Sequence, residues 1–215
     1  MNPFVLDGKT VSVWPGSQPG APAVYLNTYG EEGGQVRAEM DKLGCPDCSL
    51  VAVSGLDWDK DLSPWPAPAV RRGEEPFAGG AAEYLAWMTG ALLPGTPCWE
   101  GLAGYSMAGL FAVWALGRTH VFRRGASMSG SLWYPGIREY LMAHPPRPDC
   151  LYFSLGSKES NTRNTLMAAV EENTRAIQAF CRGQGITTTF QLNPGNHFRD
   201  TAARTAAGIA WMLEQ

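Results

Sequence analysis

The sequence lacks an excess of charge of either sign. Its 17 lysines and arginines stand against 20 aspartates and glutamates, which leaves a formal net charge of −3. A chain so close to neutral has no strongly positive surface for a phosphate backbone or an anionic membrane. We therefore expect no nucleic-acid partner and no membrane partner.

Long hydrophobic runs are also missing. The longest apolar stretches, such as Gly109–Leu116, fall far short of the ~20 residues that a membrane-spanning helix needs. Met1–Lys9 contains no basic cluster followed by an apolar run, so we predict no signal peptide. The five cysteines are few and odd in number, which is typical of reduced thiols. These features favour a cytoplasmic protein.

The composition is that of a globular protein. Of the 215 residues, 45% are hydrophobic and 17% are charged, which excludes wholesale disorder. No repeat, low-complexity tract or break in composition divides the chain, so we predict a single domain over residues 1–215. The sequence leaves the oligomeric state open, and a homo-oligomer is one alternative.

Short apolar runs alternate with helical stretches along the chain. The expected strands are Thr10–Trp14, Ala23–Asn27, Ser49–Ser54, Cys98–Tyr105, Phe122–Met128, Cys150–Leu155 and Ile186–Leu192. The expected helices are Glu31–Leu43, Glu83–Leu93 (stopped by Pro94), Met107–Leu116, Asn164–Cys181 and Thr201–Leu213. This alternation predicts an α/β fold with a mostly parallel central sheet and helices on both faces.

Residues 55–80 do not follow the alternation. They combine weak periodicity with four prolines and two tryptophans, Trp58 and Trp65. A loop of this length inside a compact domain is usually functional, and we expect it to act as a lid over a site. The alternative is a connection that its own aromatic side chains seal.

The strongest chemical signal is Gly104-Tyr105-Ser106-Met107-Ala108-Gly109, where a serine lies between an expected strand and an expected helix. Small residues two positions before and after the serine permit the sharp, strained turn of a nucleophile elbow. Such a turn lifts the serine hydroxyl above the carboxyl ends of the strands. The pattern predicts Ser106 as a catalytic nucleophile.

A serine nucleophile needs a base, and the chain has three histidines. His197 lies in a tight loop between the last expected strand and the last expected helix, where a hydrolase of this kind carries its base. His120 follows the helix after the serine and is more typical of a residue that caps a helix end, and His144 lies in a surface-like turn before two prolines, which is typical of a solvated residue. We predict that His197 is the base.

The acid that orients the base is predicted by elimination. Glu159 follows the carboxyl end of an expected strand, on the edge where Ser106 and His197 emerge. The other acidic residues between the serine and the histidine lie in helices or before a strand: Glu139, Asp149, Glu171 and Glu172. The alternative for Glu159 is a solvated loop residue.

Two further groups complete the predicted site. The backbone N–H of Met107, directly after the nucleophile, and that of Tyr29, after an early strand, are the expected oxyanion-hole donors, with Thr28 as the next choice. Trp65 and Trp133 are predicted to line the substrate pocket. The alternative for both tryptophans is a structural role in the core or in the long loop.

Metal and redox chemistry are the first competing hypothesis. Cys45-Pro46-Asp47-Cys48 is a lone pair of cysteines without a second pair or histidines at matching spacing, and Cys48 opens a strand where a redox pair would open a helix. We therefore predict no metal site and no cofactor.

With these motifs, the chain resembles the putative-esterase branch of the α/β-hydrolases, which includes esterase D-like, feruloyl-type and siderophore trilactone esterases. The resemblance covers nearly the whole chain. It depends on the Ser106 motif and on Ser129-Gly130-Ser131-Leu132-Trp133, Leu155-Gly156-Ser157-Lys158-Glu159 and Gly195-Asn196-His197-Phe198. Residues 56–65 are similar to a stretch of small bacterial members.

The resemblance implies an α/β-hydrolase fold and hydrolysis of a small-molecule carboxylic ester through an acyl-enzyme, without a cofactor. The chain is too short for a large cap domain. Ser157 stands where relatives often carry aspartate, so a Ser–His dyad is an alternative to a triad with Glu159. An acyltransferase with the same residues, or a non-catalytic binding module, is also left open, as is the physiological ester.

Overall fold

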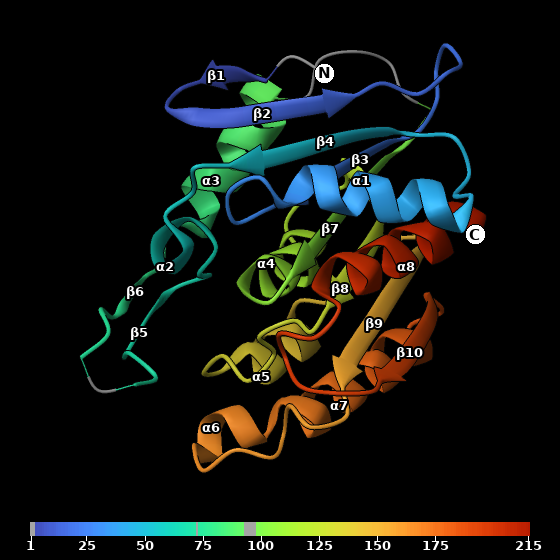
Figure 1. Cartoon of the computed structure of the whole chain (residues 1–215). Helices are drawn as coiled ribbons and strands as arrows, with labels where there is room; N and C mark the ends of the chain where they lie inside the picture. The colour runs from blue at the N-terminus through green and yellow to red at the C-terminus, as the bar shows by residue number, and fades with distance from the viewer. Residues whose placement is uncertain (1–2, 72, 93–97) are drawn as a thin grey trace.

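The computed structural model describes residues 3–71, 73–92 and 98–215, and its centre is one eight-stranded sheet (Figure 1). In spatial order the strands are β1 (Phe4–Leu6), β2 (Lys9–Trp14), β4 (Ser49–Ser54), β3 (Ala23–Asn27), β7 (Glu100–Tyr105), β8 (Phe122–Met128), β9 (Cys150–Gly156) and β10 (Thr187–Asn193). β2 is antiparallel to β1 and to β4. The next six strands in spatial order, β4, β3, β7, β8, β9 and β10, are parallel to one another. The predicted α/β fold with a mostly parallel sheet is confirmed.

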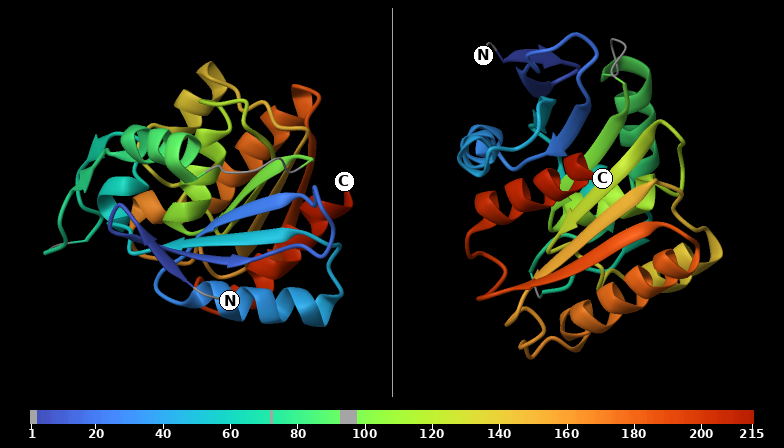
Figure 2. Two further views of the ribbon diagram at one scale, coloured as in Figure 1. Left: turned by 90° about the horizontal axis from the view of Figure 1, so that it is seen from above. Right: turned by 90° about the vertical axis from the view of Figure 1, so that its right-hand side faces the viewer.

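Helices cover both faces of this sheet. α1 (Glu32–Leu43) and α8 (Thr201–Glu214) lie together on one face. The other face carries α3 (Ala81–Trp87), α4 (Met107–Ala115), α5 (Ile137–Ala143) and α7 (Val170–Gly183), as Figure 2 shows. The sequence dictates these two layers because consecutive strand residues point to opposite faces.

The core follows this division. On β3, Val24 and Leu26 belong to the hydrophobic cluster beneath α1 and α8, whereas Tyr25 belongs to the cluster beneath α3, α4 and α7. α4 is buried along its whole length, which matches its continuous run of apolar and small residues. The helix after Ser106 is therefore held firmly against β7 and β8.

Several element boundaries differ from the sequence expectation. β1 was not predicted, because it is a short edge strand with exposed side chains and pairs only with β2 across a turn at Asp7 and Gly8, both of which have positive φ. The helix expected over Asn164–Cys181 is two helices, α6 (Thr165–Ala168) and α7, which meet at Ala169. The side chain of Asn164 caps the first of them.

The helix expected over Glu83–Leu93 also differs, because it does not remain α-helical to its end. α3 continues into a π-helical turn, Met88–Leu92. Leu93 and Pro94, where the sequence predicts the end of this helix, lie outside the described residues, as do Met1 and Asn2 of the N-terminal stretch.

The segment predicted as a lid-like loop, residues 55–80, carries three short elements in its described part, which excludes Arg72. They are α2 (Trp58–Asp61), β5 (Pro66–Ala67) and β6 (Phe77–Ala78), the last two paired antiparallel. The segment leaves the end of β4 and extends outward, away from the sheet, at the left of Figure 1. In the described ranges, no cap-sized insertion separates successive strands, and none of the helices has the length and apolar character to cross a bilayer.

Candidate active site

Ser106 lies at the sharp turn between β7 and α4. Its backbone has φ 59° and ψ −123°, a conformation that residues other than glycine rarely adopt. Gly104 makes the turn sterically feasible, because a Cβ at this position would come within 2.3 Å of the backbone of Ala108. Both features are those of the nucleophile elbow that the sequence predicts.

The neighbouring loops hold Glu159 and His197 at the same edge. β9 and β10 are parallel and in register to their ends, where Gly156 pairs with Asn193. Beyond this pair, the N–H of Ser157 bonds to the carbonyl of Asn193, and the N–H of Lys158 to that of Gly195. The loops that carry the acid and the histidine are therefore tied to each other.

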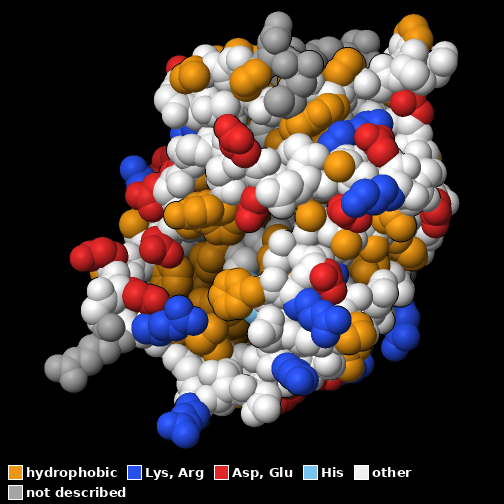
Figure 3. Space-filling model, viewed as in Figure 1, with side chains coloured by type: hydrophobic (Ala, Val, Ile, Leu, Met, Phe, Trp, Pro, Cys, Tyr) orange, Lys and Arg blue, Asp and Glu red, His pale blue; other side chains and the backbone are white. Residues whose placement is uncertain are grey.

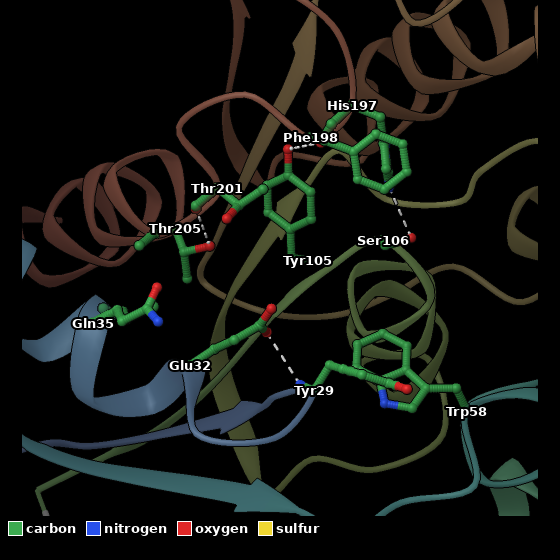
Figure 4. A pocket seen from close by; sticks show the side chains of 12 residues that line it. Tyr29, Glu32, Gln35, Trp58, Tyr105, Ser106, His197, Phe198, Thr201 and Thr205 are labelled. Carbon is green, nitrogen blue, oxygen red and sulfur yellow. Dashed lines mark hydrogen bonds between the residues drawn. The ribbon is translucent and has the colours of Figure 1, made fainter.

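The three side chains form a continuous hydrogen-bonded chain. His197 Nε2 lies 3.0 Å from Ser106 Oγ, and His197 Nδ1 lies 2.8 Å from Glu159 Oε2. Figure 4 shows the contact between Ser106 and His197 at the wall of a cavity. With its Nδ1 proton directed at a carboxylate, the imidazole has Nε2 free to accept the serine proton. Neither His120 nor His144 lines a described cavity at Ser106.

The other carboxylate oxygen of Glu159 has its own set of donors. Oε1 accepts hydrogen bonds from the N–H of Gly156 at 2.5 Å, from Ser129 Oγ at 2.6 Å and from Arg204 at 3.1 Å. Burial raises the pKa of this carboxyl, but the hydrogen bonds from His197, Ser129 and Gly156 outweigh it and lower the pKa to about 2. Glu159 is thus held as a buried anion.

Arg204 is a part of the site that the sequence reasoning missed. Its side chain is only 4% exposed, and its guanidinium contacts Glu159, Ser129 and the carbonyl of Asn196 (3.3 Å), next to the histidine. The signal was present, because Arg204 is the one charged residue in Thr201–Leu213. A lone charge in an apolar helix is expected to have a buried partner.

Ser129 and Tyr105 are also part of this supporting shell. Ser129 has φ 46°, and its backbone is held by the carbonyl of Ser154. The Tyr105 hydroxyl donates to the carbonyl of His197 at 2.7 Å. Burial raises the pKa of Tyr105 to about 12, so the hydroxyl keeps its proton. Tyr105 precedes the nucleophile in the sequence, but nothing local indicated that it would hold the histidine loop.

The predicted oxyanion-hole donors lie on both sides of Ser106. Met107 is the first residue of α4, where a helix leaves its N–H groups without intrahelical acceptors. Pairing of Asn27 with Gly104 brings the end of β3 beside the elbow. The N–H of Thr28 is bonded to the backbone carbonyl of Val53 at 2.9 Å, whereas the acceptor of the Tyr29 N–H is a side chain, which makes Tyr29 the better candidate of the two. The N–H of Tyr29 donates to Glu32 Oε2 at 3.1 Å.

Two cavities meet at the candidate nucleophile. One has a volume of about 300 Å³ and lies towards α1 and α8, and the other, of about 460 Å³, lies towards residues 59–77 and α7. Ser106, His197 and Phe198 line both of them. Phe198 is 78% exposed, and its ring stands edge-on to that of His197. Figure 3 shows a hollow with hydrophobic walls on this side of the molecule.

The two tryptophans that were predicted to line the pocket have different surroundings in the structure. Trp133 lines the larger cavity together with Ser106 and Met107. Trp65 lines neither cavity at Ser106, and its indole N–H instead donates to the carbonyl of Pro135 at 3.1 Å while its ring packs on Tyr140. These contacts favour the structural alternative for Trp65, in which the loop seals itself against α5, and the pocket role of Trp65 stays a prediction.

Cys45 and Cys48 are placed as packing residues. Burial raises the pKa of both thiols, that of Cys48 to about 11. Within the described ranges, the His, Cys, Asp and Glu side chains form no group of three or more that could hold a metal ion.

The fold is that of known esterases. Matching structures include siderophore hydrolase EstA from Aspergillus nidulans (18% identity, 96% of this chain and 90% of that one, TM-score 0.73). They also include an IroE-like serine hydrolase from Shewanella oneidensis (16%, 96% and 76%, 0.76) and the enterobactin esterase FES from Shigella flexneri (14%, 99% and 58%, 0.74). No protein-family model and no curated protein matches the sequence. The comparisons confirm the expected α/β-hydrolase fold.

Proposed function

We propose that this chain is a serine hydrolase that cleaves carboxylic esters through an acyl-enzyme. The observation that carries the proposal is the chain of contacts from Ser106 through His197 to Glu159, with distances of 3.0 and 2.8 Å, at a strained turn that opens onto two cavities. A packing role alone would not require a serine at positive φ or a buried, anionic glutamate beside a histidine.

In the proposed mechanism, Ser106 Oγ attacks the ester carbonyl while His197 Nε2 accepts its proton. Glu159 holds the Nδ1 proton and stabilises the imidazolium that forms. The backbone N–H groups of Met107 and Tyr29 bind the oxyanion of the tetrahedral intermediate. His197 then protonates the leaving alcohol, and a water molecule activated by the same histidine hydrolyses the acyl-enzyme.

The two cavities suit an ester with a sizeable group on each side of the scissile bond. They meet at Ser106, so the acyl part and the alcohol part each have a separate volume. The proteins of similar fold include siderophore hydrolases and a ferulic acid esterase. A siderophore ester and a feruloyl ester are therefore the first substrates to assay, beside simple acyl esters. We also propose a cytoplasmic location, which the five cysteines without a disulfide support.

The test combines covalent labelling with turnover. A fluorophosphonate probe should label the wild-type protein at Ser106, and Ser106→Ala should remove the label and lower ester turnover to background, a loss of about 10⁴-fold or more. The thermal midpoint of the variant should stay within a few degrees of the wild type. Wild-type protein that is folded but neither labelled nor active would favour a binding module, and turnover retained by Ser106→Ala would refute the proposed nucleophile.

A further inference from the structure

Glu32, the first residue of α1, stands in the candidate active site with no role in the proposed mechanism. Its side chain lines the 300 Å³ cavity together with Ser106, and its Oε2 accepts the N–H of Tyr29 at 3.1 Å. Figure 4 shows the carboxylate reaching from the helix to this N–H.

This contact creates a competition. The N–H of Tyr29 is one of the two proposed oxyanion donors, and it cannot be directed fully at a carboxylate and at a substrate oxyanion. The neighbouring N–H of Thr28 cannot replace it, because it is bonded to the carbonyl of Val53. When the oxyanion takes the N–H of Tyr29, Glu32 loses its partner and remains as a negative charge beside a second, developing negative charge.

The surroundings do not neutralise Glu32. Among the described residues, no Lys or Arg forms an ion pair with it, and none lines this cavity. His197 is the one side chain of the cavity wall that takes up a positive charge in the proposed mechanism, and Glu159 is already its partner. The other polar side chains of the wall carry no charge that could pair with Glu32: Gln35, Tyr105, Ser106, Thr201 and Thr205. Glu32 is exposed, so water solvates its carboxylate when the cavity is empty. A bound substrate that covers this carboxylate displaces that water and must itself supply the compensating group.

We propose that Glu32 is a specificity-determining residue that selects esters carrying a hydrogen-bond donor, an ammonium or a hydroxyl group, close to the scissile carbonyl. The donor takes the place of the Tyr29 N–H on Glu32 and releases that N–H to the oxyanion. An ester without such a group leaves the carboxylate unpaired in the transition state and reacts more slowly. The inference rests on the proposed esterase function.

Three esters of p-nitrobenzyl alcohol test the inference, because their acids share one carbon skeleton: propanoic acid, lactic acid and alanine. The value of kcat/KM is measured for each with the wild type, with Glu32→Ala and with Glu31→Ala. Glu31 is the matched control, since it is an exposed acidic neighbour whose side chain does not line the cavity. Comparing ratios between proteins cancels the different intrinsic reactivities of the esters.

In Glu32→Ala, propanoate turnover should rise and the preference for the donor-bearing ester over propanoate should fall about tenfold or more, while Glu31→Ala keeps the wild-type ratios. A fall for alanine alone identifies an ammonium group, and a fall for both alanine and lactate identifies any donor. Ratios within twofold of the wild type, in a protein that the fluorophosphonate still labels, would overturn this inference and leave the esterase proposal intact. A wild type that is neither labelled nor active would instead remove the esterase proposal.

Discussion

Glu159 shows at the scale of single residues how much of this site depends on one charge. It accepts hydrogen bonds on both carboxylate oxygens, from His197 on one and from Gly156, Ser129 and Arg204 on the other. Its side chain is only 5% exposed, so water contributes little to its stabilisation. Hydrogen bonds from the protein replace the water that burial removes from the carboxylate, and the Glu159 anion orients the imidazole of His197 towards Ser106.

The first prediction concerns turnover in Glu159→Gln. A neutral amide can present its N–H to the histidine and favour the wrong tautomer, and it no longer stabilises the imidazolium. We expect kcat to fall by several orders of magnitude, on the scale of the ~10⁴-fold loss known for a neutralised triad acid. A loss of about tenfold or less, with Ser106 still labelled, would instead identify a Ser–His dyad.

The second prediction is a pH dependence of stability. The pKa of Glu159 is about 2 in the folded protein against an ordinary value of 4.5, so this group stabilises the fold fully above about pH 4.5. The contribution is lost as the pH falls towards about 2, because the unfolded chain then binds the proton first. Each pH unit between the two pKa values is worth about 1.4 kcal/mol, which makes the whole effect at most about 3 kcal/mol.

Urea unfolding of the wild type and of Glu159→Gln at a series of pH values measures this effect. The unfolding free energy of the wild type should exceed that of the variant by the largest amount above about pH 4.5. As the pH falls to about 2, the wild type should lose about 3 kcal/mol of stability relative to the variant. A difference that does not change between about pH 5 and pH 3 would show that Glu159 is not held as an anion by its neighbours.

At the scale of elements, the segment over residues 55–80 is attached to the turn after β8, and this turn also contributes a wall of the larger cavity. The hydroxyl of Tyr134 donates to the carbonyl of Trp65, and the indole of Trp65 donates to the carbonyl of Pro135. These reciprocal bonds attach the segment to the start of α5. Trp133, in the same turn, faces the larger cavity instead.

The third prediction compares these two tryptophans. Trp133→Ala enlarges the cavity beside Ser106, so kcat/KM should shift in favour of esters with bulkier groups and change most between small and large substrates. Trp65→Ala removes packing and a hydrogen bond away from the cavity, so the thermal midpoint should fall while all esters are affected alike. Thermal melts and an ester panel distinguish the two; selectivity changed by Trp65→Ala but not by Trp133→Ala would reverse the assignment.

At the scale of the whole molecule, one sheet joins every part of the site. The contributing loops follow β3, β7, β8, β9 and β10, which are adjacent in the sheet and parallel. Arg204 extends this connection to α8, because its guanidinium reaches Glu159 and the histidine loop from the last helix. The relative placement of Ser106, His197 and Glu159 therefore depends on the integrity of the sheet and of its two hydrophobic layers.

The fourth prediction follows from that arrangement and tests the single-domain hypothesis. Urea unfolding followed by tryptophan fluorescence and by far-ultraviolet circular dichroism should give coincident transitions, because helices on both faces pack on the same strands. Loss of ester turnover should follow the same curve. Separate transitions, with one part of the chain unfolding first, would indicate two independent units.

The sequence by itself determined the features that depend on local pattern. The alternation of apolar strands and helices predicted the layered sheet, and Gly104, Ser106 and Ala108 predicted the strained turn because its sterics involve only neighbouring residues. The end positions of the strands also brought Glu159 and His197 to the correct edge. Their catalytic roles, like those of the oxyanion donors, stay predictions until the variants are assayed.

Only the tertiary structure decided which side chains meet across long separations in the chain. Arg204 lies 45 positions from Glu159, Trp65 lies 70 positions from Pro135, and no periodicity in the sequence relates them. The contact of Glu32 with Tyr29 is local, but its meaning depends on the pairing of Asn27 with Gly104, which places that turn beside the nucleophile. Strand order and register are set by packing of the whole core. This is why the partners of Arg204 and of Trp65, unlike the candidate catalytic residues, could not be predicted from the sequence.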